Sequence, residues 1–191
     1  MSVEPKRLKS KPAMYPPRRG KKPTIENYQP SRGMKSDERG TPWDLFLLLH
    51  AIFCFTWDVC ASPRNHKCRC YWTKKHNAIA LSWLGLICFM NPPYSPELTV
   101  WVQKACLEAL QGTTIVAVLP AWCDAAWFRR HCTDAYPVML CGRVQFEGYT
   151  GIAPWGCMVC VWNGTSEQLA KLDTALGVKR LTIGIGTMPT K

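Results

Sequence analysis

The chain has 191 residues, 47% of them hydrophobic, which is enough for a single domain with a substantial core. No stretch reaches the roughly 18 uninterrupted apolar residues of a membrane span, and no apolar run follows the basic N-terminus, so neither a membrane protein nor a signal peptide is expected. The chain has eleven cysteines, an odd number, which favours an intracellular protein with reduced thiols. Its net charge of +11 favours an acidic partner.

The positive charge is concentrated at the N-terminus. Residues 1–40 contain 11 Lys and Arg against 4 Asp and Glu, a net +7, whereas the other 151 residues carry a net +4. The same segment holds 6 of the 15 prolines and few large apolar residues, which is typical of a disordered arm. Such an arm favours phosphate binding through counterion release; the alternative is a solubilising tail. The folded domain is therefore expected at residues 41–191.

Predicted strands and helices alternate along this domain. The first is a helix over residues 43–53, with Thr41 as its cap and Pro42 at its start. The other expected elements are strands at 56–60, 69–73 and 84–90, a helix at 96–110, a strand at 113–119, a helix at 123–132, strands at 136–141 and 155–162, a helix at 165–176 and a strand at 181–183. The alternation is typical of an α/β sheet with crossover helices. Ligands bind such sheets beyond the carboxyl ends of the strands, which is where Asp58 and residues 91–94 fall.

Cysteine and histidine side chains cluster in one short stretch and call for comparison with a zinc site. They are Cys60, His66, Cys68, Cys70 and His76. Cys68 and Cys70 are separated by one residue, not the two usual in zinc knuckles, and no second pair follows, so we expect no metal site. Cys157 and Cys160 lie in a predicted strand, where residues three apart point to opposite faces.

The tetrad Asn91-Pro92-Pro93-Tyr94 follows a buried strand directly and precedes a helix. An exocyclic amino group is a poor nucleophile, because its lone pair is delocalised into the ring. The side-chain oxygen of Asn91 and the carbonyl of Pro92 can each accept one of its hydrogens and so hold it in line for attack. The prolines fix the backbone so that both acceptors point to one place, and Tyr94 offers a face for an extruded base. The pattern predicts methyl transfer to a planar nitrogen; the alternative is an ordinary proline-rich loop in which Tyr94 only packs.

Further residues extend in a characteristic order and spacing on both sides of this tetrad. They are Thr41-Pro42, Leu45-Phe46, Phe55 to Pro63, Asn65, Lys67-Cys68, Tyr71-Trp72-Thr73, Trp83, Ser95, Leu119-Pro120-Ala121, Asp124, Trp127, Gly142-Arg143, Phe146 and Ala153-Pro154. In these residues the chain resembles the phage-type, Dam-like DNA N6-adenine methyltransferases over about residues 41–162. The resemblance implies a Rossmann-like fold, S-adenosylmethionine as cofactor and DNA as partner, in the cytoplasm of a bacterial cell that hosts the phage or prophage.

The resemblance also implies which residues hold the cofactor. Asp58 lies in the cofactor-binding segment, and Thr41-Pro42 matches the segment that approaches the methionine end of the cofactor. Relatives tend to be acidic at residues 74–77, where this chain is basic. Asn77 can still accept a hydrogen bond there, whereas lysine side chains cannot.

On the substrate side, the resemblance implies that Asn91, Pro92, Pro93 and Tyr94 form the catalytic motif. Three further residues are candidate substrate contacts: Ser95 after the tetrad, Trp122 where relatives often carry a basic residue, and Arg143, which either contacts the DNA backbone or holds the active-site loop. Two alternatives stay open, namely methylation of RNA adenine or a protein glutamine amide by the same motif, and an inactive module that only binds DNA. The sequence does not give the oligomeric state.

Overall fold

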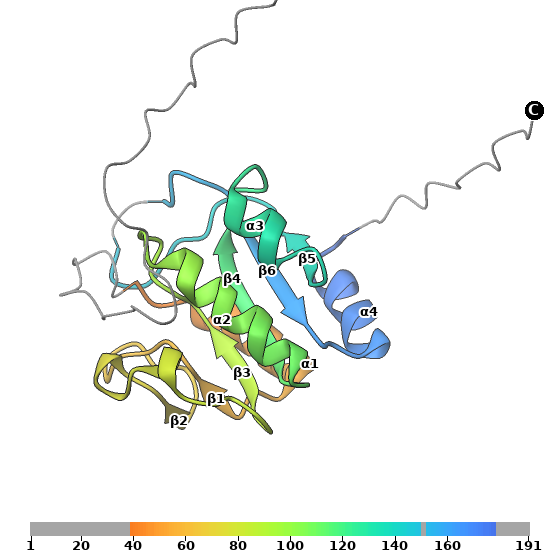
Figure 1. Cartoon of the computed structure of the whole chain (residues 1–191). Coiled ribbons are helices and arrows are strands. Elements are labelled where there is room, and N and C mark those ends of the chain that lie inside the picture. Colours follow the sequence, from red (N-terminus) through yellow and green to blue (C-terminus); the bar gives the residue numbers. More distant parts are fainter. Residues whose placement is uncertain (1–38, 150–151, 179–191) are drawn as a thin grey trace, which may run out of the picture.

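The computed structural model describes residues 39–149 and 152–178 (Figure 1). Its elements, in chain order, are α1 (Trp43–Phe53), β1 (Trp57–Asp58), β2 (Cys70–Tyr71), the 3-10 helices η2 (Lys74–His76) and η3 (Ala78–Ala80), β3 (Ile87–Met90), α2 (Leu98–Leu110), β4 (Thr114–Pro120), α3 (Ala126–His131), β5 (Tyr136–Met139), β6 (Cys157–Trp162) and α4 (Ser166–Ala175). Most of them coincide with elements predicted from the sequence. The basic arm up to residue 38 and the strand predicted at 181–183 lie outside the described residues.

The six strands form one mixed sheet in the order β2-β1-β3-β4-β6-β5. β2, β1, β3 and β4 run parallel, whereas β6 is antiparallel to its neighbours β4 and β5. From β1 the chain adds β2 on one side, and then β3 and β4 on the other, so the direction of winding reverses between β1 and β3. Ligands of open α/β sheets bind at such a reversal, beyond the carboxyl ends of the two strands.

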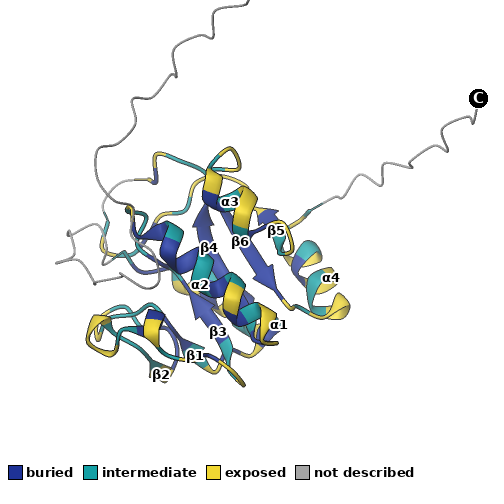
Figure 2. Ribbon diagram, in the orientation of Figure 1, coloured by how far each residue is buried: buried dark blue, intermediate teal, exposed yellow. Residues whose placement is uncertain are grey.

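Helices cover both faces of the sheet, and the inner strands β3, β4 and β6 are almost wholly buried (Figure 2). Alternate residues of β4 point to the two faces: Ile115 packs in the core beneath α2 and α3, while Val116 packs in the core beneath α1 and α4. Burial on both faces explains why β4 reads as an unbroken apolar run. Cys157 and Cys160 fall into opposite cores, as their spacing in a strand predicts.

The start of β3 differs from the sequence prediction. The apolar run begins at Leu84, but the strand begins at Ile87. Gly85 has a positive φ of 80°, which forms a turn and leaves Leu84 exposed. The apolar run is therefore part turn and part strand.

The start of α1 also differs, because Thr41 does not cap the helix. The residue at the cap position is Pro42, and no side chain caps the helix there. The Leu45 N–H instead donates to Asp44 Oδ1 at 2.8 Å. Thr41 is thus buried beside the helix, but its hydroxyl makes no hydrogen bond to the helix.

Two later helices begin after the residues predicted. α2 starts at Leu98, since its first residues form a turn in which the Leu98 N–H donates to the Ser95 carbonyl. α3 starts at Ala126, after a turn closed by Ala125 and Trp122. In the part of the chain that the structure describes, no helix is long and apolar enough to cross a membrane.

Candidate active site

A small pocket lies beyond the carboxyl end of β3, where the direction of winding reverses. It encloses about 120 Å³ and is lined by Arg39, Asn91, Pro92, Pro93, Tyr94, Phe146 and Trp155. The four residues of the predicted catalytic motif therefore line one pocket. The other three come from distant parts of the chain, and the sequence did not assign them to the site.

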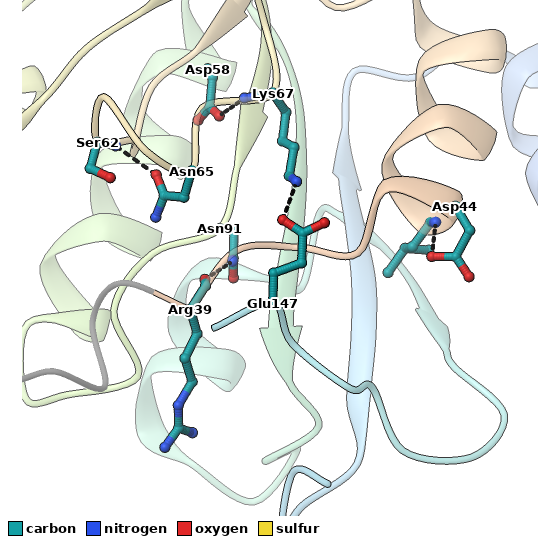
Figure 3. Close-up of polar contacts among 9 residues, drawn as sticks. Arg39, Asp44, Asp58, Ser62, Asn65, Lys67, Asn91 and Glu147 are labelled. Carbon is teal, nitrogen blue, oxygen red and sulfur yellow. Dashed lines mark hydrogen bonds and ion pairs between the residues drawn. The ribbon is translucent and has the colours of Figure 1, made fainter. Parts of the chain in front are cut away.

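The side chain of Asn91 is oriented by a backbone contact (Figure 3). Its Nδ2 donates a hydrogen bond of 3.1 Å to the carbonyl oxygen of Arg39. Among the described residues no donor reaches Asn91 Oδ1 or the carbonyl oxygen of Pro92. Two acceptors on adjacent residues are therefore available to a planar amino group in the pocket.

Tyr94 is held by its hydroxyl and by its ring. The hydroxyl donates to the carbonyl oxygen of Val118 in β4 at 3.1 Å, and the ring lies edge-on to Phe146 with 5.8 Å between centroids. Burial raises the pKa of the Tyr94 hydroxyl well above its usual value, so the group stays protonated and does not act as a base. Trp155 lies 6.1 Å from the same ring, and Trp122 packs edge-on behind Trp155 at 5.5 Å. Trp122 thus supports the pocket and does not line it.

An ion pair ties three chain segments together around the pocket (Figure 3). Lys67 Nζ lies 2.6 Å from Glu147 Oε2 and 4.0 Å from the centre of the Trp43 ring. The Lys67 side chain is only 2% exposed. Glu147 also exchanges two backbone hydrogen bonds with Gly40, of 3.2 and 2.8 Å. Residues 39 and 40, which the sequence assigned to the arm, therefore belong to the folded site.

Asp58 shapes the loop after β1 from a buried position. Its side chain accepts the Cys60 N–H on one oxygen at 3.2 Å and the Lys67 N–H on the other at 3.0 Å. Burial raises the pKa of the Asp58 carboxyl to about 6, although the two hydrogen bonds and the nearby positive charge of His66 act in the opposite direction. Because both oxygens are engaged and the residue is 3% exposed, Asp58 holds the loop in place.

We expect Asp58 to make the free energy of unfolding fall as the pH rises from about 4 to about 6. Its folded-state pKa of about 6 exceeds the ordinary value of 3.8, so the stabilisation is present below the lower value and is lost through the higher one. The shift corresponds to roughly 3 kcal/mol. Urea unfolding of wild type and Asp58→Asn across this range measures it. A difference between the two proteins that does not vary with pH would contradict the assignment.

Several buried polar atoms have no hydrogen-bond partner among the described residues. Three of them belong to the segments around the pocket: Oγ1 of Thr41, Oδ1 of Asn77 and Nε1 of Trp155. Thr41 is 1% exposed and follows Gly40 in the segment beside the pocket. Asn77 has a positive φ of 49° and follows the turn after β2. Because buried polar groups are nearly always paired, the oxygens of Thr41 and Asn77 are candidate acceptors for a bound group.

A family model described as DNA N-6-adenine-methyltransferase (Dam) matches residues 31–171, which is most of the chain. The chain belongs to the Dam family. A curated relative from Haemophilus phage HP1 (strain HP1c1), called "DNA N-6-adenine-methyltransferase", is 32% identical over 102 residues. That alignment covers 51% of this chain and 59% of the relative.

Two candidate substrate contacts of this Dam-family protein lie outside the pocket. The Ser95 hydroxyl accepts the Glu97 N–H at 3.2 Å and so supports the turn that leads into α2. Arg143 is exposed in the loop that carries Phe146, and its positive charge lowers the pKa of Cys157 against the larger effect of burial. Neither residue is among those that line the pocket.

The pocket residues of this Dam-family protein that the sequence did not predict share one property. Arg39, Phe146 and Trp155 approach the tetrad from positions 39, 146 and 155, so only the folded chain brings them to it. Phe146 already belongs to the residues that carry the family resemblance, which was the available signal. Within the described ranges no group of three or more His, Cys, Asp or Glu side chains is placed to hold a metal ion.

Proposed function

We propose that this protein methylates the N6 amino group of adenine in DNA, with S-adenosylmethionine as methyl donor, on a Rossmann-like methyltransferase fold. The proposal rests on the hydrogen bonding of the Asn91 side chain. Its amide nitrogen is anchored on the Arg39 carbonyl, which leaves Oδ1 and the Pro92 carbonyl as acceptors in an aromatic-walled pocket. Membership of the Dam family supports the same reaction. We place the activity in the cytoplasm of a bacterial host, as expected for an enzyme encoded by a phage or prophage.

The two acceptors address the chemical difficulty of the reaction. The lone pair of the adenine amino group is delocalised into the ring, so the nitrogen is a weak nucleophile. Hydrogen bonds to Asn91 Oδ1 and the Pro92 carbonyl hold the amino group in line and stabilise the positive charge that develops on nitrogen. A bound S-adenosylmethionine would supply the methyl group to this nitrogen, and its sulfur would be the leaving group and keep the electron pair of the broken carbon–sulfur bond. The extra proton on nitrogen leaves to water afterwards, so no side chain with a matched pKa is needed.

The fit to the cofactor rests on the unpaired buried atoms. When bound, S-adenosylmethionine supplies a methyl group on a positively charged sulfur, and it also carries hydroxyl, amino and ammonium donors. Thr41 Oγ1 and Asn77 Oδ1 can accept hydrogen bonds from such donors. Pro42 fixes the backbone beside Thr41, and Asp58 contributes indirectly by holding the loop of residues 58–67. The reversal of winding between β1 and β3 supports both a Rossmann-like fold and a binding site at this edge.

We expect Tyr94→Ala to lower kcat/KM for DNA by about 5- to 150-fold, since stacking a base on an aromatic ring contributes about 1–3 kcal/mol. Tyr94→Phe keeps the ring and loses the hydroxyl with its hydrogen bond to the Val118 carbonyl, so it should remain within a few-fold of wild type. Steady-state methylation of a DNA duplex measures both. Equal losses in the two variants would show that the hydroxyl contact matters and base stacking does not.

The test of the proposed function compares acceptor substrates under one condition. The full chain is incubated with methyl-labelled S-adenosylmethionine and, separately, unmethylated DNA, RNA of the same sequence and a glutamine-containing protein extract. Label in DNA alone supports the proposal. Label in RNA or protein alone assigns the motif to another planar nitrogen. If no acceptor is labelled and a titration shows no binding of the cofactor, the proposal is overturned in favour of a module that only binds DNA.

A further inference from the structure

One edge of the molecule carries exposed positive charge without neighbouring acidic side chains. Between Asp58 and Glu97 the chain contains five Lys and Arg residues and no Asp or Glu. Four of these cations are exposed, namely Arg64, Arg69, Lys74 and Lys75. No carboxylate of the described residues lies within 4.0 Å of Arg64, Arg69 or Lys75, and these three are here called the basic edge.

The three residues of the basic edge gather around β2, the outermost strand of the sheet. Arg69 immediately precedes β2, and Lys75 lies in η2 shortly after it. The turn that carries Arg64 packs against the same strand, because the His66 ring stacks on the Tyr71 ring with 4.2 Å between centroids and an angle of 6°. The charges therefore lie along one side of the sheet and not around the whole surface.

The basic edge adjoins the pocket at two points. Two strand spacings, about 10 Å, separate β2 from β3, whose carboxyl end carries Asn91. A Cβ placed on Gly40 would lie 3.5 Å from Cβ of Asn65, so the turn containing Arg64 sits directly beside the segment that anchors Asn91. Since one nucleotide advances about 3.4 Å along a strand, this edge reaches phosphates about three nucleotides from a base held in the pocket.

We infer that the basic edge binds the phosphate backbone of the DNA beside the target adenine. The inference rests on the proposed function, because it assumes that the pocket receives an extruded base. Extruding a base costs a few kcal/mol, which contacts to nearby phosphates can offset. Exposed Arg and Lys without acidic neighbours are suited to this role, since phosphate contact releases counterions. Exposed Lys171, by contrast, is paired with Glu167 at 2.7 Å.

A second exposed arginine pair offers a matched control. Arg129 and Arg130 lie at the end of α3, next to His131. The His131 carbonyl accepts a hydrogen bond from Trp162, which pairs with Ile115 near the amino end of β4. Arg129 and Arg130 therefore lie toward the amino end of β4, whereas the pocket lies beyond the carboxyl end of β3. Replacing this pair removes the same two charges without touching the basic edge.

The experiment compares Arg64→Gln/Arg69→Gln with Arg129→Gln/Arg130→Gln in the full chain. Binding to a fluorescent DNA duplex is measured at several salt concentrations, and the slope of log K against log salt is determined. We expect the slope to become shallower by about 2 for the Arg64/Arg69 variant, since each lost phosphate contact removes about 0.9. The Arg129/Arg130 variant should keep the wild-type slope, and adding Lys75→Gln to the first should lower it by about 1 more.

The outcomes separate this inference from the proposed function. Equal slope changes in both double variants, or an unchanged slope in the Arg64/Arg69 variant, would overturn the inference even if adenine methylation is normal. If wild type methylates no adenine but its slope depends on Arg64 and Arg69, the edge binds DNA and the proposed function fails alone. The urea concentration at the midpoint of unfolding, which should be equal in all variants, checks that each protein is folded.

Discussion

Replacing Asn91 by alanine is expected to lower the single-turnover rate of methyl transfer to DNA by about 10²–10³-fold, the range found when one charge-stabilising contact is removed from an active site. The variant loses the amide oxygen that accepts the amino hydrogen and keeps only the Pro92 carbonyl. It also loses the Nδ2 contact to Arg39 that orients the side chain. Rapid mixing of DNA with protein pre-loaded with the cofactor measures the step. Affinity for the cofactor should not change.

Asn91→Asp provides the matched control for this prediction. A carboxylate keeps two acceptor oxygens of similar size, but it cannot donate to the Arg39 carbonyl. We therefore expect a rate between those of wild type and Asn91→Ala. An alanine variant within a few-fold of wild type would show that Asn91 does not hold the reacting amino group, and a dead aspartate variant would assign the loss to the Arg39 contact.

Replacing Glu147 by alanine is expected to destabilise the protein by about 3 kcal/mol, because the change leaves the Lys67 ammonium buried without its partner. Lys67 is 2% exposed, while the Glu147 side chain is 40% exposed, so solvent relieves part of the cost and the low end of the usual range for buried pairs applies. The ion pair also joins Trp43, Gly40 and the loop of Glu147 around the pocket. Urea unfolding measures the loss.

Two variants test whether the loss of stability in Glu147→Ala arises from the burial of the Lys67 charge. Glu167→Ala breaks the exposed Lys171–Glu167 pair on α4, whose side chains are 60% and 77% exposed, and should leave the free energy of unfolding almost unchanged. Lys67→Met/Glu147→Leu removes both buried charges and should recover most of the stability lost in Glu147→Ala. If Glu147→Ala and Glu167→Ala cost the same, the Lys67–Glu147 pair does not hold the site together.

The sequence predicted most of the elements, because their signals are local. The β-branched run of β4 and the apolar stretch of α1 fix their own secondary structure, and Asn91 to Tyr94 lies at a strand end as the pattern required. The errors are local as well. The prediction of one strand over residues 84–90 overlooked the turn at Gly85. The prediction of Thr41 as a cap was also wrong, because Pro42 occupies the cap position and no side chain caps the helix.

The rest of the site depends on contacts between distant segments, which one sequence does not reveal. Nothing in the sequence around Arg39 shows that its carbonyl meets Asn91, 52 residues later. Lys67 and Glu147 are ordinary charged residues until the fold brings them within 2.6 Å. Asp58 was expected in the cofactor-binding segment, and that expectation stays a prediction. What the sequence did not reveal is that its carboxylate accepts hydrogen bonds from the backbone N–H groups of Cys60 and Lys67.

The identity of the methylated nucleoside tests the central claim most directly. Unmethylated DNA is treated with the full chain and methyl-labelled S-adenosylmethionine, digested to nucleosides and separated by liquid chromatography with mass detection. We predict that the label appears in N6-methyladenine and that Asn91→Ala slows its appearance by about 10²–10³-fold. Label in a methylated cytosine, or label in N6-methyladenine that persists at the wild-type rate in Asn91→Ala, would contradict the account.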